Sequence, residues 1–498
     1  MNDVFSFSMN RRILFCAFLF IAFSVQLSAQ DDNSFGSNGF TGFREELLED
    51  YNDFRREINA EYIDFLTKAW KEYRLFQGKV PDETPKPLSP VLFQEEKNMR
   101  DEAVKVDGIL EKIPDSMPVR RGGQKEEDSD NRWLGQTNDS LRLDFFGAEL
   151  AIHYQRRQFS LSGITERSVG NLWKDITDSR FTTLLKDMLH HKQKMQMNDW
   201  AYFLLAKKVA ARLSSLQSKD CRMVFQHFLL VQSGYDVRLG RVDNFLVLLL
   251  PVREEVYACP YLELDGKLFY VISDEDKKMK GHSSIFTYRL PDKLVQAPYL
   301  SLMMHKELLL PVLPKSFCVK AAEMEIKGEV NQNEIRFYKE YPSCELAVYA
   351  RAAVTDRLGK QLKAALSAHL SGKPFAEALN RLLLWVQAGF RYQTDGEQFG
   401  YEKPFFMAEN FYYPASDCED RSILFAWLVR HLLGREVVLL DYPGHMATAV
   451  SVGKDQIRGA YVELNGKRYV VCDPTYVNAK AGQMMPSYRT KRAKVIRL

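Results

Sequence analysis

Residues 413–422 read Tyr-Pro-Ala-Ser-Asp-Cys-Glu-Asp-Arg-Ser, and they predict the start of a helix whose first turn carries a cysteine. Ser416 and Asp417 are favourable N-cap residues, and an acid follows three positions after each of them, as in a capping box. An apolar face at helical spacing comes next, and Gly434 is a typical C-terminal stop. Cys418 is therefore expected where unpaired backbone N–H groups and the helix dipole favour a thiolate.

Two further polar residues stand at the ends of strands that the sequence predicts after this helix. His445 precedes an alternating run, Ala447 to Val452, that is typical of a strand. Asp473 directly follows a second strand, Arg468 to Cys472, which an Asn-Gly turn introduces. A thiol becomes a strong nucleophile when an imidazole takes its proton, and a third group must orient that imidazole. We therefore expect Cys418, His445 and Asp473 to act as nucleophile, base and orienting residue.

The order and flanks of these residues resemble the transglutaminase-like superfamily, whose fold is papain-like. In that family a cysteine begins a helix, a histidine begins a strand and an Asp-Pro pair follows a further strand, as Asp473-Pro474 does here. The resemblance spans Asn380 to Val477 and implies acyl transfer at an amide bond. The oxyanion would be held by the Cys418 backbone N–H and a second donor. The candidates for that donor are Gln387, Gln393 and Tyr412.

Other features favour a non-catalytic alternative. Asp417, Glu419 and Asp420 should disfavour a thiolate unless they point away or pair with Arg421. Taken singly, a cysteine at a helix start or a histidine before a strand is more often structural than catalytic. The alternative is an envelope scaffold or binding protein that uses the same fold. Zinc is disfavoured because one cysteine and one histidine lack the paired short spacings of zinc ligands, so we expect no metal and no cofactor.

The strand region has a counterpart 200 residues earlier in the chain, as residues 461–471 resemble 261–271. Residues 434–439 resemble 234–239 at the same offset, so we infer an internal duplication. The residues opposite Cys418, His445 and Asp473 are Ser218, Phe245 and Ser273. The earlier copy would therefore keep the fold and lack the triad.

The first residues of the chain predict export. A short basic start precedes an apolar run from Ile13 to Val25 that is too short to span a bilayer comfortably, and Ala29 ends a cleavage site. We interpret residues 1–29 as a signal peptide and expect no later transmembrane segment. The mature protein is expected in a bacterial periplasm, or secreted. Such compartments permit disulfides, and Cys318 with Cys344 is a candidate pair.

The chain has 498 residues, of which 46% are hydrophobic and 27% charged, an ordinary globular composition. Its formal net charge of +3 gives no reason to expect a nucleic-acid partner. The predicted fold class is α+β and multidomain. The predicted parts are a signal peptide (1–29), a helical segment with Pro-rich and charged linkers (30–135), a degenerate transglutaminase-like domain (136–290), a β-rich connector (291–354) and a transglutaminase-like domain (355–498).

Two aromatic stretches have functional alternatives. Aromatic residues spaced mostly by three and four predict one long amphipathic helix from Phe43 to Phe76. Its aromatic face would pack within the protein or contact an envelope partner. The loop from Gln393 to Tyr413 leads into Cys418, and it would form a wall of the substrate site or pack over the helix. The stretch from Gly78 to Pro90 is Pro-rich and expected to be extended.

The sequence thus predicts an exported cysteine enzyme that acts on amide bonds of peptides or proteins. Water as the acceptor gives a peptidase or amidase, and an amine gives a cross-linking enzyme. We favour hydrolysis because bacterial members of the resembled family more often look like proteases.

Overall fold

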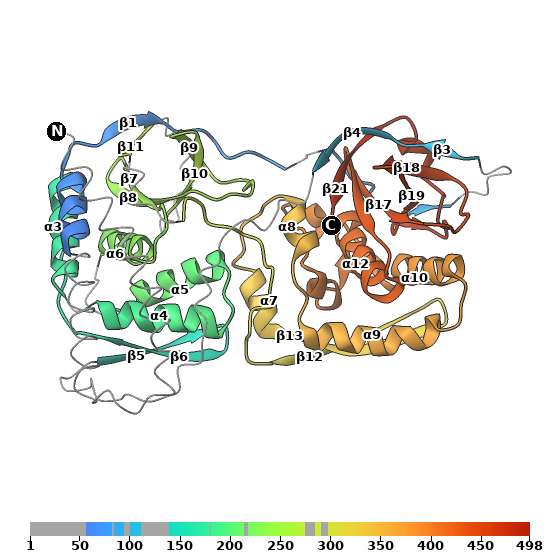
Figure 1. Ribbon diagram of the computed structural model, residues 1–498, viewed down its shortest axis with the longest axis horizontal. Coiled ribbons are helices and arrows are strands. Elements are labelled where there is room, and N and C mark those ends of the chain that lie inside the picture. Colours follow the sequence, from blue (N-terminus) through green and yellow to red (C-terminus); the bar gives the residue numbers. More distant parts are fainter. Residues whose placement is uncertain are drawn as a thin grey trace, which may run out of the picture. The chain divides into compact units, whose positions relative to one another are not determined.

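The computed structural model is a mixed α+β protein (Figure 1). The described residues are 56–81, 84–93, 100–110, 139–179, 181–213, 218–273, 284–289 and 297–498. The chain divides into two units, Met1–Phe65 and Leu66–Leu498, and the described part of the first unit is entirely helical. The predicted signal peptide, the predicted helix before residue 56 and the charged linker lie outside the described residues. In the described part of the chain, no helix combines the length and the apolar character needed to cross a membrane.

The N-terminal helix ends earlier than the sequence predicts. Residues 56–66 are helical, whereas Lys71–Arg74 form strand β1, which pairs antiparallel with β11 (Ser284–Thr287). The prediction of one continuous helix is therefore wrong beyond residue 66. Tyr73 and Leu75 alternate with charged residues and pack against a sheet core. The apolar spacing of this short stretch fits a helix and a strand equally well, and pairing with β11 makes it a strand.

The middle of the chain combines a hairpin, a helical layer and a sheet of order β1-β11-β7-β8-β10-β9. Helices α4 and α5 contact the hairpin, and α6 packs against β8 of the sheet. The elements are β5 (Asp139–Phe145), β6 (Ala148–Tyr154), α3 (Glu166–Thr177), α4 (Thr182–Lys194), α5 (Asp199–Arg212), α6 (Lys219–Gln232), β7 (Arg238–Val242), β8 (Phe245–Leu250), β9 (Tyr261–Leu264) and β10 (Lys267–Ile272).

The C-terminal part repeats this plan with a sheet of order β3-β18-β19-β17-β16-β21-β4. Its first elements are the hairpin β12 (Pro314–Ala321) and β13 (Met324–Asn331), then α7 (Gln332–Tyr338), α8 (Leu346–Arg351), α9 (Asp356–Leu370), α10 (Phe375–Gly389), β14 (Arg391–Tyr392), α11 (Asp395–Gln398), the 3-10 helix η3 (Met407–Phe411) and β15 (Ala415–Ser416). The remaining elements are α12 (Cys418–Leu428), the π-helical turn η4 (Val429–Leu433), β16 (Val437–Tyr442), β17 (His445–Ser451), β18 (Ala460–Leu464), β19 (Lys467–Cys472), β20 (Tyr476–Val477), η5 (Pro486–Tyr488) and β21 (Arg492–Arg497).

Short strands from the N-terminal part complete this C-terminal sheet region. Strand β3 (Glu102–Ala103) pairs with β18, and β4 (Lys105–Leu110) pairs with β21, both in parallel. Strand β2 (Val91–Leu92) pairs in parallel with β20. Residues 91–93 and 102–110 therefore lie against the part of the chain that carries the candidate triad.

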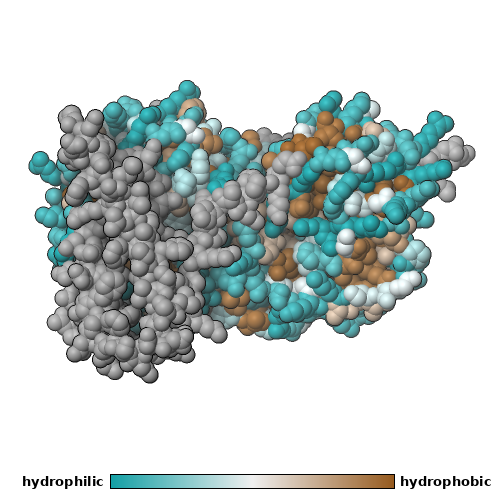
Figure 2. Space-filling model, in the orientation of Figure 1, coloured by the Kyte–Doolittle hydropathy of each residue, from teal (hydrophilic) through white to brown (hydrophobic). Residues whose placement is uncertain are grey.

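Alternate residues of the C-terminal strands form one apolar core. Leu440 of β16 and Ala449 of β17 are buried in it, and α12 packs against the same two strands. Burying one large aliphatic side chain stabilises the fold by about 1.5–3 kcal/mol, so many such contacts hold the helix and the sheet together. In the space-filling view, hydrophobic side chains reach the surface over the region of β4 and β21, where Ile109 is 42% exposed (Figure 2).

The pairing register of the C-terminal sheet repeats that of the middle sheet at an offset of 200 residues. The pair Tyr442 and His445 repeats Val242 and Phe245. The neighbours β17 and β19 show the same offset when compared with β8 and β10. Both Asx-Gly turns, at Gly266 and Gly466, have positive φ angles, as type I′ hairpin turns require. The two sheets thus share strand order, register and turn geometry.

Replacing Gly482 with alanine tests a close backbone approach after β19. Gly482 has φ +91°, and a Cβ atom there would lie 2.1 Å from the carbonyl oxygen of Arg458. Gly466 has φ +71° but open space around it. We expect Gly482→Ala to lower the free energy of unfolding by about 3 kcal/mol or more, and the matched control Gly466→Ala by about 1–2 kcal/mol. Urea unfolding measures both, and equal losses would contradict the assigned backbone contact.

Candidate active site

Cys418 is the first residue of α12, and the helix start is held by several contacts. Oδ2 of Asp420 accepts a hydrogen bond from the backbone N–H of Asp417 at 3.2 Å, which is one half of the predicted capping box. The Ser422 hydroxyl donates to the carbonyl oxygen of Met446 at 3.1 Å and so ties the first turn to β17. These contacts fix the thiol relative to the strand that begins at His445.

His445 and Asp473 meet because β17 and β19 run antiparallel with Thr448 opposite Cys472. Nε2 of His445 lies 2.8 Å from Oδ2 of Asp473, and both residues are buried. Nδ1 of His445 has no hydrogen-bond partner among the described residues. The imidazole is therefore oriented by a carboxylate on one side and keeps its other nitrogen for a further partner.

The carboxylate of Asp473 is itself held in place. Its Oδ1 accepts hydrogen bonds from the backbone N–H and the hydroxyl of Thr475, at 3.0 Å and 2.9 Å, and from the N–H of Tyr476 at 3.1 Å. Burial alone would raise the pKa of Asp473, but the charge of His445 and these hydrogen bonds lower it below its usual value. Asp473 is therefore ionised and able to stabilise an imidazolium.

Cys418 and His445 line one cleft, together with Tyr442, Gly444 and Glu419 among others. Cys418 is 1% exposed and His445 is 4% exposed, so the cleft is almost closed over both. The hydroxyl of Tyr442 is buried and has no hydrogen-bond partner within the described ranges. All three residues singled out from the sequence thus gather at this cleft, with Asp473 behind His445.

The three oxyanion candidates from the sequence do not line this cleft. Gln387 donates both bonds of its amide group, to the carbonyl oxygens of Asp473 at 2.9 Å and Ala479 at 3.0 Å. Its side-chain oxygen accepts the N–H of Asn478 at 3.1 Å. Gln387 therefore positions the segment after β19, and its donors are engaged.

The other two candidates also lie elsewhere. Gln393 is half-buried between β14 and α11. The Tyr412 ring lies 3.8 Å from Nζ of Lys315, and its carbonyl oxygen accepts a hydrogen bond from the same ammonium. Tyr412 thus belongs to a cation–π contact with the hairpin strand β12.

The acids beside Cys418 share a partner that the sequence did not suggest. Nζ of Lys86 lies 2.9 Å from Oδ2 of Asp417 and 2.7 Å from Oε2 of Glu402, and it also donates to Oε1 of Glu419. Pairing with Arg421, one of the two ways in which these acids could have spared a thiolate, does not occur, because that guanidinium donates to backbone carbonyl oxygens and to the Ser416 hydroxyl. Lys86 stands 331 residues before Asp417, and no local pattern links the two.

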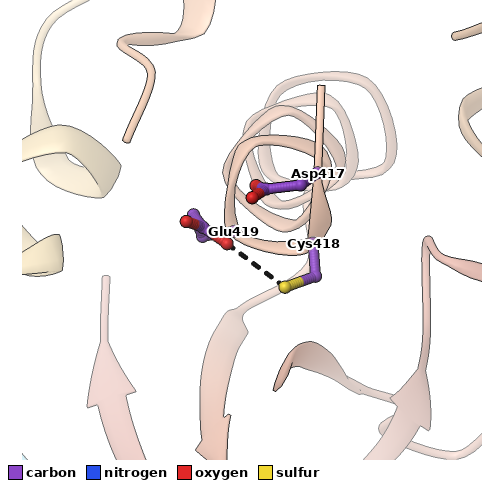
Figure 3. Close-up of side chains that lie close together, drawn as sticks. All are labelled: Asp417, Cys418 and Glu419. Atoms are coloured by element: carbon purple, nitrogen blue, oxygen red, sulfur yellow. Dashed lines mark hydrogen bonds between the residues drawn. The ribbon is translucent and has the colours of Figure 1, made fainter. Parts of the chain in front are cut away.

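The thiol of Cys418 is neutral in this arrangement. Its Sγ–H donates to Oε2 of Glu419 at 3.2 Å, and Figure 3 shows this contact with the carboxylate of Asp417 nearby. Burial raises the pKa of Cys418 well above 9.0, and the charges of Glu419 and Asp417 add to the rise, whereas Lys86 opposes it. The helix N-terminus therefore does not produce a thiolate here, because the local acids outweigh it.

The acidic cluster extends beyond the two acids that flank the cysteine. Burial and neighbouring carboxylates raise the pKa of Asp395 to about 9 and that of Asp420 to about 7. Carboxylate oxygens of Asp395, Glu402 and Glu419 lie within 4.8 Å of one another, a grouping that suits a cation. The cation that neutralises this grouping in the structure is the ammonium of Lys86.

Comparisons with protein-family models, curated proteins and solved structures found no match to this chain. The residues and geometry of the site therefore carry the functional argument.

The cysteines that follow the predicted signal peptide are all free, and none forms a disulfide within the described residues. The expected pair of Cys318 and Cys344 is not formed, since Cys318 is exposed on β12 and Cys344 is buried. Cys472 is buried beside Asp473, with its Sγ near the carbonyl oxygen of Val470. The thiol of Cys418 is thus not blocked by a disulfide.

The neutral thiol predicts a specific pH dependence. Alkylation of Cys418 by iodoacetamide, resolved by peptide mass spectrometry, should keep accelerating as the pH rises through 9. Glu419→Gln removes the negative charge beside the thiol, so it should move the midpoint of the rate profile to lower pH. Glu377→Gln, an exposed acid on α10, serves as the control and should leave the midpoint unchanged. A wild-type profile that levels off below pH 7 would contradict the neutral thiol.

Proposed function

We propose that this chain is an exported cysteine enzyme of the transglutaminase-like superfamily, and that it acts on amide bonds of peptides or proteins. The observation that carries the proposal is the hydrogen bond of 2.8 Å between His445 and Asp473, formed at a cleft that Cys418 also lines. His445 keeps Nδ1 without a partner among the described residues, as a base for that thiol must. The sequence order of the three residues supports the same family.

The proposed reaction has two stages. Nδ1 of His445 takes the proton of the Cys418 thiol, and the sulfur attacks the carbonyl carbon of the amide. The imidazolium, held by Asp473, then gives its proton to the leaving amine nitrogen as the carbon–nitrogen bond breaks, which leaves a thioester on Cys418. A water molecule next gives a proton to His445 and attacks the thioester, so the carboxylic acid leaves and the thiol is restored.

Two donors suit the oxyanion of the tetrahedral intermediate. The backbone N–H of Cys418 is in the first turn of α12, where N–H groups lack helical partners. Tyr442 is among the residues that line the cleft, and its buried hydroxyl is free of hydrogen-bond partners among the described residues. Removing one such donor typically lowers kcat by about 10²–10³-fold. We assign the second donor to Tyr442 in place of the candidates drawn from the sequence.

Activation requires the thiol proton to change its partner. In the resting arrangement Sγ–H donates to Glu419, and the reaction needs it to face His445. Rotation of the Cys418 side chain about its Cα–Cβ bond supplies that change without moving the helix. Hydrolysis is favoured over cross-linking because water can act on the thioester without a second binding partner.

A non-catalytic binding protein is the second candidate. The neutral, almost covered thiol favours it, and so does the middle part of the chain, which has Ser218, Phe245 and Ser273 at the corresponding positions. On this alternative the cleft would bind an envelope component without changing it.

Hydrolysis of a peptide library separates the two candidates. The wild-type chain should cleave a subset of the library, and Cys418→Ala should lower that rate by about 10³-fold or more, because the nucleophile is lost. Cys318→Ala, an exposed cysteine on β12, is the matched control and should cleave like wild type. Equal cleavage by wild type and Cys418→Ala would refute the catalytic assignment, and a library left intact by every variant would favour the binding protein.

A further inference from the structure

A segment of the chain itself forms part of the wall of the cleft at the candidate nucleophile. Thr84 and Lys86 are among the residues that line it. A Cβ atom on Gly444 would lie 2.8 Å from the carbonyl oxygen of Pro85, so the backbone of the segment touches the turn before His445. The segment therefore borders the cleft with its main chain beside Gly444 and with its lysine at the acids.

The lysine of this segment makes the strongest contacts. The side chain of Lys86 is 12% exposed, and its ammonium group bridges the carboxylates of Glu402, Asp417 and Glu419. Asp417 is fully buried, and its Oδ1 remains without a hydrogen-bond partner among the described residues. A buried carboxylate with an unused acceptor oxygen suits a ligand group with several hydrogen-bond donors. An ammonium group has three.

Backbone hydrogen bonds hold the chain on either side of residues 84–86. Upstream, the Ala258 N–H donates to the carbonyl oxygen of Lys79 at 2.7 Å. Downstream, the N–H of Phe93 donates to the carbonyl oxygen of Val477 at 2.9 Å. Between these anchors the described residue Leu88 is 73% exposed and adds little apolar burial. The ion pairs of Lys86 are made by one ammonium group, which another molecule can also supply.

We propose that Lys86 is a tethered occupant of a lysine subsite in the wall of the cleft, and that the substrate is an extended peptide whose lysine ammonium binds Glu402, Asp417 and Glu419 in place of Lys86. This inference rests on the proposed function for the bond that reacts, and it adds the substrate class. A tether of this kind holds its ligand at an effective concentration of about millimolar, so the segment weakens substrate binding without abolishing it.

The charge of the site gives the reason for lysine selectivity. Displacing Lys86 with a neutral peptide would leave buried carboxylates without a counter-charge, whereas a lysine peptide restores it. A lysine side chain is favoured over a free amine because the occupant contacts the cleft through its backbone as well as its ammonium.

Binding to a catalytically inert chain tests the inference apart from the reaction. The probe is the acetylated and amidated peptide Thr-Pro-Lys-Pro-Leu-Ser, the sequence of residues 84–89, and its partner has norleucine in place of lysine. In Lys86→Met with Cys418→Ala, calorimetry should show the lysine peptide binding at least about tenfold more tightly than the norleucine peptide. With Lys86 retained in Cys418→Ala, the lysine peptide should bind at least about tenfold more weakly than in the double variant.

A control variant separates the loss of Lys86 from the loss of any exposed lysine. Lys360→Met removes an exposed lysine paired with Asp356, and it should bind the probe like the chain that retains Lys86. If Lys86→Met does not fold, the variant Lys86→Met with Glu402→Gln takes its place. It removes one positive and one negative charge, and it keeps Asp417 and Glu419 to bind the lysine of the peptide. Equal binding of the two peptides, or binding of 1,5-diaminopentane as tightly as the lysine peptide, would overturn the inference. Neither result depends on hydrolysis, so the proposed function stands or fails separately.

Discussion

The antiparallel pairing of β17 with β19 is the constraint on which the site depends. It sets Thr448 opposite Cys472, and so brings His445, at the start of one strand, to Asp473, just after the other. The same register occurs 200 residues earlier between β8 and β10, where Phe245 and Ser273 occupy the corresponding positions. The register therefore forms without an imidazole and a carboxylate at these two positions, so His445 and Asp473 are not required for the strand pairing that brings them together.

The buried position of Cys418 and the acids around it raise the pKa of its thiol and so oppose formation of a thiolate. Five acids surround the first turn of α12, and the ammonium of Lys86 is the cation that touches three of them. Burial alone would raise the pKa of Glu419, but the charge of Lys86 lowers it, so an ionised carboxylate sits beside a neutral thiol. Under the proposed function, a substrate that carries its own ammonium would keep this charge balance, and a substrate without one would leave carboxylates unpaired.

Local signals made part of this site predictable from the sequence. Acids near a helix start, an alternating strand after His445 and the Asx-Gly turn before Asp473 each act over a few residues, and the structure has the corresponding helix and strands. The constant offset of 200 residues between similar segments is matched in strand pairing, because register is set by turns that the two copies share. The α+β class follows from the same patterns.

Contacts between distant segments were not predictable. Lys86 reaches the acids from an extended segment whose sequence shows only prolines, and Arg421, much nearer in sequence, donates to carbonyl oxygens instead. Gln387 has the right type for an oxyanion donor, but its position at the end of a buried helix commits it to the chain after β19. The helix predicted to end at Phe76 failed because apolar spacing at Tyr73 and Leu75 fits a strand equally well.

Acylation of Cys418 by a reactive ester reports directly on whether this thiol is a nucleophile that His445 activates. Intact-protein and peptide mass spectrometry after a brief exposure to p-nitrophenyl acetate would show whether one acetyl group is transferred to this thiol, and how fast. We expect a thioester on Cys418 in the wild-type chain. It should form at least about 10²-fold more slowly in His445→Gln, because the imidazole that takes the thiol proton is absent. Equal rates in the two proteins, or acetylation that spares Cys418, would contradict it.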